Sequence, residues 1–190
     1  LQEIAQKGFS PSALTSYIRN PMNYYFQYIL KIKQVDQVEE NIELNTLGTI
    51  IHKTLEALYT PFLNKILTES DIDLCFLQLD AEVLRQFKFI YKEGEIKKGR
   101  NLLAFEVAKR NVSNFLKMEL ELLKNGDVVK ILHLEKRFEN TLVHKNLPFP
   151  ILIGGEIDRL EERNGKIRII DYKSGRVETA SLNLKSWHNL

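Results

Sequence analysis

The sequence predicts an α+β fold, in which a helical part of about residues 1–126 precedes a β-rich core of about residues 127–190. Apolar residues recur at a helical spacing through most of the first part. From Val128 the pattern alternates with a period of two, which is typical of half-buried strands. Asn164-Gly165 marks a tight hairpin, because both central turn positions need a positive φ. Helices followed by strands favour a helical layer packed on one face of a sheet.

Composition indicates one ordinary globular domain. Of the 190 residues, 27% are charged and 44% are hydrophobic, which suffices for a proper core. The formal net charge is only +2, so any binding of nucleic acid must come from a local patch or from bound cations. No stretch approaches the roughly 18 apolar residues of a membrane span.

Cysteine usage restricts the possible chemistry. Cys75 is the only cysteine, which excludes an internal disulfide and any four-thiolate zinc or iron–sulfur site built by this segment alone. A single cysteine and the lack of a signal sequence favour a reducing, cytoplasmic location. The chain begins at Leu1 rather than Met, so we expect a single domain cut from a longer multidomain protein.

Five helices are expected, each bounded by recognisable start or stop signals. Ser10-Pro11 and Asn20-Pro21 each supply a capping side chain followed by proline at the first helical position. Asn125-Gly126 is a typical C-terminal stop. The helices are expected from Pro11, from Pro21, over Asn45–Tyr59, from Ser70 or Asp71 to Tyr91, and over Asn101–Lys124.

Four strands are expected after the helices. Val128–Glu139 is the first, and Thr141–Lys145 is interpreted as a short returning partner. A proline-containing connector leads to Ile151–Glu162 and Lys166–Lys173, the two strands of the Asn-Gly hairpin.

The hairpin register brings acidic residues together. Counting back from the turn at Asn164-Gly165 places Asp158 opposite Asp171 and Glu156 opposite Lys173. Two carboxylates about 5 Å apart repel each other and destabilise the sheet. A divalent cation between them removes this cost, whereas the alternative is an exposed strand end with solvated charges.

The residue types suit metal-dependent hydrolysis of phosphodiesters. Asp158 and Asp171 offer the oxygen ligands that Mg²⁺ prefers. Glu156 is a further ligand or an ion-pair partner of Lys173. Lys173 is placed to orient a water molecule and to stabilise charge on a pentavalent phosphorus.

A second group of polar residues lies on the third predicted helix. Gly48, His52 and Glu56 are four residues apart and share one helical face. The glycine suggests close approach of another backbone near His52. Taken alone, His52 is more simply a surface histidine paired with Glu56.

Glu135 offers one more carboxylate. It shares a strand face with His133 and Arg137, and it joins the acidic cluster if its strand neighbours the hairpin. A solvent-facing side of the strand is an equally good interpretation.

Two groups of residues are candidates for DNA contacts. Tyr17 and Arg19 belong to an aromatic and cationic cluster that can stack bases, although such residues at helical spacing more often pack helices. Lys97, Lys98 and Arg100 form a basic loop that is either a phosphate contact or a solvated turn.

Taken together, four blocks resemble the RecB-type nuclease domain of the PD-(D/E)xK superfamily, particularly its version in AddB-type components of helicase–nuclease complexes. Gly48–Glu56 is similar to the family's Gly-x-x-x-His-x-x-Leu-Glu motif. Gly155–Arg159 is similar to Gly-x-Ile-Asp-Arg, and Asp171–Gly175 to Asp-Tyr-Lys-Thr-Gly. The opening helix pair, with Ser10–Tyr17, Pro21 and Tyr24–Phe26, is also similar.

The resemblance implies a restriction-endonuclease-like core, with a mixed sheet, the hairpin at its centre and flanking helices. It implies a DNA exonuclease of recombination or repair that uses Mg²⁺ or Mn²⁺ and works with a helicase partner. The implied residues are the ligands His52, Asp158 and Asp171, the catalytic Lys173, and the accessory Glu56 and Glu135.

Two departures from the family accompany this resemblance. Asn20 stands where AddB-type domains carry a cysteine of an iron–sulfur cluster, so no cluster is expected in this segment. The family's Gln-x-x-x-Tyr helix is not found among the 17 residues after Lys173. Alternatives are a stand-alone CRISPR or phage-type nuclease, the former disfavoured by the missing cysteines, and a non-catalytic DNA-binding or scaffolding domain.

Overall fold

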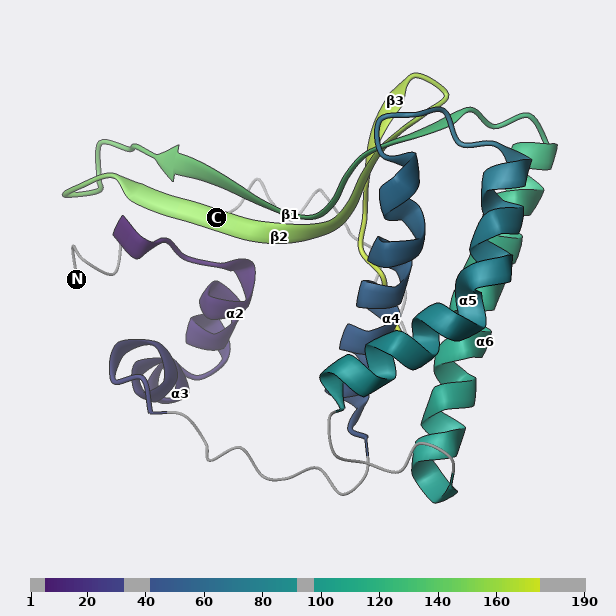
Figure 1. Cartoon of the computed structure of the whole chain (residues 1–190). Helices are drawn as coiled ribbons and strands as arrows, with labels where there is room; N and C mark the ends of the chain where they lie inside the picture. The colour runs from purple at the N-terminus through teal and green to yellow at the C-terminus, as the bar shows by residue number, and fades with distance from the viewer. Residues whose placement is uncertain (1–5, 33–41, 92–97, 175–190) are drawn as a thin grey trace.

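A computed structural model describes residues 6–32, 42–91 and 98–174, and it confirms the α+β fold. Figure 1 shows the course of the chain, with helices preceding strands. The elements are α2 (Pro11–Arg19), α3 (Pro21–Tyr24), the π-helical turn η1 (Tyr25–Ile29), α4 (Leu44–Tyr59), the 3₁₀ turn η2 (Thr60–Phe62), α5 (Glu69–Ile90), α6 (Gly99–Lys124), β1 (Val129–Leu142), β2 (Ile151–Arg163) and β3 (Lys166–Ile170).

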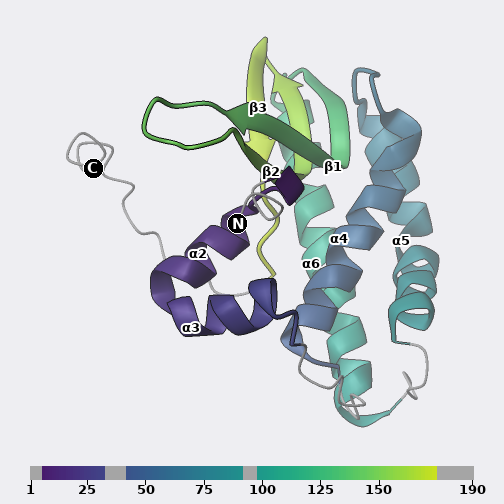
Figure 2. The same cartoon turned by 90° about the vertical axis from the view of Figure 1, so that its left-hand side faces the viewer.

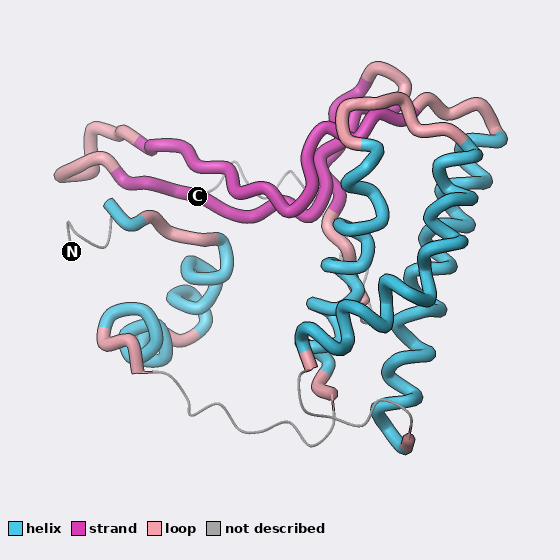
Figure 3. The backbone as a smooth tube through the Cα atoms, viewed as in Figure 1, coloured by secondary structure: helices cyan, strands magenta, loops and turns pink. Residues whose placement is uncertain are grey.

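The helices form two groups beside a long, curved sheet. Helices α4, α5 and α6 pack together at the end of the sheet that carries β3 (Figures 1 and 2). Beyond β3, the paired strands continue as an arm, which is made of residues 136–142 of β1 and 151–157 of β2. Helices α2 and α3 lie next to that arm (Figure 3). A bridge between Phe9 and Ile153 ties the chain just before α2 to the arm.

The predicted helix signals act as expected. The Ser10 side chain accepts a hydrogen bond from the Ala13 N–H, and the Asn20 side chain caps α3. Helix α5 starts at Glu69, one or two residues earlier than predicted, because Thr68 forms a capping box with Asp71. After α6, Gly126 adopts a φ of 93°, the conformation that makes glycine a common helix stop.

The core lies between the three long helices and the sheet. Ile50 on α4, Val83 on α5 and Val112 on α6 are each fully buried, and Ile131 on β1 closes the core from the sheet side. Burying apolar surface of this kind is the main favourable contribution to folding. None of the described helices combines the length and the apolar character that crossing a membrane requires.

The three strands form an antiparallel sheet in the order β1-β2-β3. The hairpin turn is as predicted, with φ of 52° at Asn164 and 75° at Gly165, and Arg163 pairs with Lys166. Our expectation of a mixed sheet with a central hairpin needs correction for the described residues. Within the described ranges, β2 alone is central, β3 lies at an edge, and the parallel pairing is confined to the Phe9–Ile153 bridge.

The prediction of a short return strand over Thr141–Lys145 is wrong. Strand β1 instead continues without reversal to Leu142, because β2 is long enough to pair with it throughout. The reversal comes later, and Leu142 faces Ile151 across it.

Cys75 is expected to be chemically inert in the folded chain. Its side chain is 1% exposed, and burial raises the pKa of the thiol to about 12. At pH 8 roughly one thiol in ten thousand is then ionised, and the thiolate is the reactive form. Labelling with a disulfide reagent should therefore be slow until urea unfolds the protein. Rapid labelling under native conditions would contradict this packing.

Candidate metal centre

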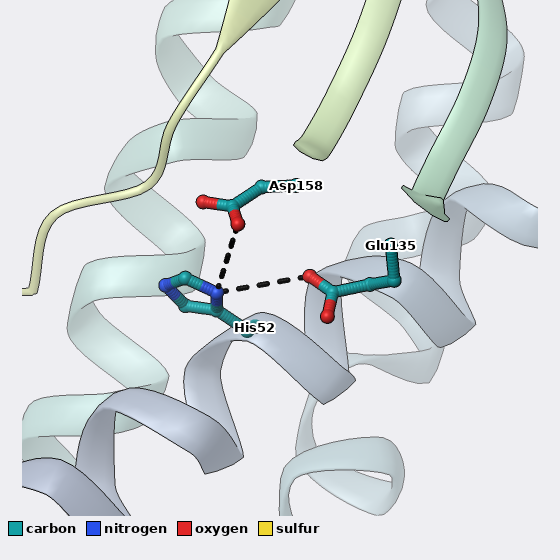
Figure 4. A group of neighbouring side chains, drawn as sticks. All are labelled: His52, Glu135 and Asp158. Carbon is teal, nitrogen blue, oxygen red and sulfur yellow. Dashed lines mark ion pairs between the residues drawn. The ribbon is translucent and has the colours of Figure 1, made fainter. Parts of the chain in front are cut away.

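Three side chains from three different elements converge at one point. His52 lies on α4, Glu135 on β1 and Asp158 on β2 (Figure 4). The His52 Nδ1 lies 3.6 Å from Asp158 Oδ1 and 3.7 Å from Glu135 Oε1. One ligand atom of each residue lies within 4.8 Å of those of the other two. The structure thus assembles an imidazole nitrogen and two carboxylates from segments far apart in sequence.

An irregularity in β1 aims Glu135 at the site. The register shifts between Ile131 and His133, and Glu135 itself has a φ of 44°. A positive φ is uncommon outside glycine and costs of the order of 1 kcal/mol, and such strain concentrates at functional sites. Leu134 pairs with Arg159, and Lys136 pairs with Ile157. Glu135 and Asp158 lie between these pairs, so their carboxylates face each other across β1 and β2.

The backbone of Tyr172 orients two of the three side chains. Its N–H donates to Asp158 Oδ2 at 2.6 Å, and its carbonyl accepts from His52 Nε2 at 2.9 Å. Because a carbonyl only accepts, the proton of a neutral imidazole lies on Nε2. The Nδ1 lone pair therefore faces the carboxylates. Metal-binding histidines are commonly oriented by a hydrogen bond from their other nitrogen.

The residues present fit a small divalent cation. Glu135 Oε1 is buried and has no hydrogen-bond partner among the described residues, which leaves an acceptor in need of a positive charge. Two bonds of about 2.1 Å from one ion place their ligand atoms at most about 4.2 Å apart. The distances of 3.6 and 3.7 Å satisfy that limit. Carboxylate oxygens are ligands that suit Mg²⁺ or Mn²⁺, and an imidazole nitrogen is a ligand of transition-metal ions.

Electrostatics also favour a cation. Burial raises the pKa of Asp158, and the nearby carboxylates of Asp171 and Glu135 raise it further. The contact with His52 lowers the pKa of Glu135 and raises that of the imidazole. Asp158 is thus unfavourably placed as an anion in the metal-free protein, and a bound cation reverses this effect.

Lys53 contacts the group, although the sequence patterns did not single it out. Its Nζ lies 2.8 Å from Glu56 Oε2 and 3.3 Å from Glu135 Oε2. Glu56, predicted as an accessory residue, therefore reaches the site through Lys53 rather than through His52. The spacing of three between Lys53 and Glu56 was the signal available in the sequence.

Asp171 and Lys173 lie just beyond the end of β3. The pairing of β2 with β3 ends at Arg159 and Ile170, one residue pair before the predicted pairing of Asp158 with Asp171. The chain leaves the ladder there, because the Tyr172 N–H bonds to the Asp158 carboxylate instead of a backbone carbonyl. Asp171 is not one of the three converging residues; its Oδ2 lies 2.5 Å from Lys173 Nζ.

The remaining predicted residues lie around the site or away from it. Glu156 is exposed and pairs with Arg137 of β1. It does not pair with Lys173 as predicted, because β3 ends before that residue. Tyr17 and Arg19 are exposed on α2, whereas Lys98 and Arg100 are exposed where α6 begins. These two places lie well apart in both views (Figures 1 and 2). Lys97 lies outside the described residues.

A buried ion network lies next to the site, and the sequence patterns did not reveal it. Arg159 and Glu161 on β2 are fully buried, and Glu119 on α6 is 1% exposed. Glu119 contacts Arg159 at 2.7 Å and Arg163 at 2.5 Å. The Arg159 guanidinium also stacks over the Tyr59 ring at 4.9 Å. The network fastens β2, and with it Asp158, to α6.

Comparison with known proteins agrees with this geometry. Residues 8–189 match the PD-(D/E)XK nuclease superfamily, and the chain belongs to that superfamily. The chain is also similar to curated proteins that are named as one of the subunits of an ATP-dependent helicase/deoxyribonuclease. In Clostridioides difficile (strain 630) the identity is 31%, covering 88% of this chain and 15% of the relative. For the relative in Streptococcus pyogenes (strain MGAS2096) the identity is 23%, covering 87% of this chain and 14% of the relative. The chain therefore spans about one seventh of the length of these relatives.

Proposed function

We propose that the chain is a divalent-metal-dependent deoxyribonuclease domain that hydrolyses DNA phosphodiester bonds as an exonuclease. The observation that carries this proposal is the convergence of His52, Glu135 and Asp158. The buried Glu135 Oε1 lacks a hydrogen-bond partner within the part of the chain that the structure describes. Membership of the nuclease superfamily supports it. A purely scaffolding domain has no need for opposed carboxylates at this position.

The roles of the ligands follow from their positions. His52, Glu135 and Asp158 are proposed to hold Mg²⁺ or Mn²⁺. Asp171, whose charge raises the pKa of Asp158, is proposed as a further ligand. A bound ion would polarise a phosphoryl oxygen and lower the pKa of a water molecule. The backbone of Tyr172 keeps His52 Nδ1 and Asp158 Oδ1 directed at each other.

Lys173 is proposed to act as a cation rather than as a base. Its contact with Asp171 raises the pKa of the ammonium, so the group stays protonated at neutral pH. The side chain is 61% exposed, so DNA can reach it, and the charge of Asp158 acts on the ammonium. There the ammonium can orient the attacking water and stabilise negative charge on the phosphorus oxygens.

Replacing Lys173 by Met should abolish most of the cleavage and leave metal binding intact. Loss of one preorganised group that stabilises transition-state charge costs roughly 10²- to 10³-fold in rate. The measurement is the rate of cleavage of end-labelled linear DNA at saturating Mn²⁺. Lys166→Met, an exposed lysine at the hairpin turn, is the matched control and should cleave normally. Equal rates for the two variants would remove Lys173 from the catalytic machinery.

The exonuclease assignment has its own test. Linear duplexes labelled at either end, and a closed circular DNA of the same sequence, are incubated with the chain and Mn²⁺. Release of short products from the linear DNA alone supports an exonuclease. Nicking of the circle at a comparable rate would instead show an endonuclease.

The relatives' name also suggests the context of the domain. We propose that the chain is one nuclease domain within a longer helicase–nuclease protein that acts in double-strand-break repair or recombination. A helicase would supply the DNA ends or single strands on which the proposed site acts. Copurification of the full-length protein with a helicase tests this context separately from the chemistry.

A further inference from the structure

A groove lies between the N-terminal helices and the arm of β1 and β2. Its volume is about 450 Å³, within the roughly 300–1,000 Å³ that is usual for ligand-binding sites. Phe9, Tyr17 and Tyr24 line it from the helical side, and Leu142 and Ile153 line it from the arm. The Tyr17 ring meets the Tyr24 ring edge-to-face at 5.5 Å, and the Tyr17 side chain is 56% exposed. The groove thus presents accessible aromatic rings rather than a closed core.

The stretches that supply this lining carry positive charge only. Residues 6–32 and 140–153 contain no Asp or Glu, although 25 of the 190 residues of the chain are acidic. Four cations each stand two positions from a lining residue, namely Lys7 from Phe9, Arg19 from Tyr17, Lys31 from Ile29 and Lys145 from Leu147. None of these cations forms an ion pair with another described residue. The groove therefore combines an apolar floor with cations that lack a counter-charge in the part of the chain that the structure describes.

This combination matches the chemistry of a single DNA strand. Unpaired bases stack on aromatic rings, while the phosphates of the same strand contact cations. Duplex DNA keeps its bases paired and stacked, so its bases are not free to enter the groove. A neutral polypeptide segment suits the apolar lining, but it leaves the four cations without a counter-charge. Charge complementarity therefore favours single-stranded DNA as the occupant.

The groove and the candidate metal centre lie on the same side of the strands. Helix α2, beside the groove, and helix α4, which carries His52, are both on that side in two views (Figures 1 and 2). Strand β2 runs from Ile153 in the groove to Asp158 in the site. Five residues of extended chain cover about 17 Å. A strand of a few nucleotides can therefore reach from the groove to the site.

We propose that this groove is a subsite for unpaired bases of a single DNA strand, with Tyr17 as the stacking platform and Arg19 as a phosphate contact. The proposal deepens the proposed function and rests on it, because it names the form of DNA that the site would receive. Binding in the groove needs no metal ion, so it is measured separately from cleavage.

The first test measures binding of fluorescein-labelled oligothymidine by fluorescence anisotropy in EDTA. Tyr17→Ala should bind about five- to a hundredfold more weakly, since it removes the stacking surface of one base. Tyr17→Phe keeps the ring and should stay within about twofold of wild type. Tyr25→Ala, a similarly exposed tyrosine outside the lining, is the matched control and should bind as wild type does. Urea unfolding checks that each variant is folded.

A second test separates bases from phosphates. An oligonucleotide made of abasic sites keeps the phosphates but offers nothing to stack. Wild type should bind it more weakly than oligothymidine, and Tyr17→Ala should distinguish the two far less. Arg19→Gln should lower the slope of log affinity against log salt by about 0.7. Arg110→Gln, an exposed arginine on α6, should leave that slope unchanged.

The outcomes distinguish this proposal from the proposed function. No measurable binding, equal binding of both oligonucleotides by wild type, or wild-type affinity of Tyr17→Ala would overturn the subsite. Each of these results would favour a polypeptide segment as the occupant. If the groove binds oligothymidine as expected but the chain does not cleave DNA with Mn²⁺, the proposed function fails and the subsite stands.

Discussion

Asp158→Asn should abolish cleavage of DNA while leaving the domain folded. Asparagine keeps the shape and the acceptor for the Tyr172 N–H, but it removes one negative charge from the proposed ligand set. A bound ion supplies several kcal/mol of charge stabilisation, so its loss should slow cleavage by roughly a thousandfold or more. The measurement is the initial rate with Mn²⁺ and with Mg²⁺.

Stability separates this effect from unfolding. In the metal-free protein the pKa of Asp158 is raised, so its ionisation weakens folding as the pH rises through that pKa. Asp158→Asn should therefore be at least as stable as wild type at neutral pH in urea unfolding without metal. Asp73→Asn, an exposed residue on α5, is the charge-matched control and should keep full activity. Normal cleavage by Asp158→Asn would contradict the proposed site.

Glu119→Ala should be among the most destabilising single substitutions in this chain. Glu119 is 1% exposed and is the carboxylate shared by Arg159 and Arg163. Its removal leaves Arg159, which is fully buried, with one fewer counter-charge. Breaking a buried ion network by removing one partner costs about 3–5 kcal/mol. The measurement is the free energy of unfolding in urea.

Asp80→Ala provides the comparison for Glu119→Ala. Asp80 on α5 pairs with Lys109 on α6 at 2.9 Å, but its side chain is 71% exposed. Exposed pairs contribute at most about 1 kcal/mol. A change below that size for Glu119→Ala would show that water reaches the arginines and that the network does not fasten β2 to α6.

Local signals predicted most of the fold because each acts over a few residues. Ser10, Asn20 and the Asn164-Gly165 turn fix helix starts and a strand register through contacts within their own segments. The length of β1 was not predictable in this way, because it depends on pairing with β2, a separate strand. The buried Arg159 was missed for a related reason. Its partner Glu119 lies 40 residues away, and alternation alone does not distinguish a buried charge from a solvated one.

The site was predictable only in part. Asp158 followed from the hairpin register, whereas His52 was assigned by family resemblance, since its helical spacing favoured a surface histidine. Glu135 remained ambiguous, because the register shift and the positive φ that aim it at the site leave no mark in the sequence. Glu135, rather than the predicted Asp171, faces Asp158 across the sheet. The two opposed carboxylates repel each other, as was predicted for Asp158 and Asp171. The roles of Asp171 and Lys173 stay predictions.

The most direct test of the central claim is a titration of the metal-free chain with Mn²⁺, followed by electron paramagnetic resonance and calorimetry. Wild type and Asp158→Asn are compared under identical conditions, with Asp73→Asn as the control. The proposed centre predicts saturable binding by wild type and by the control, and loss of that binding in Asp158→Asn. Absence of Mn²⁺ binding by wild type at millimolar concentration, or equal binding by all three proteins, would contradict it.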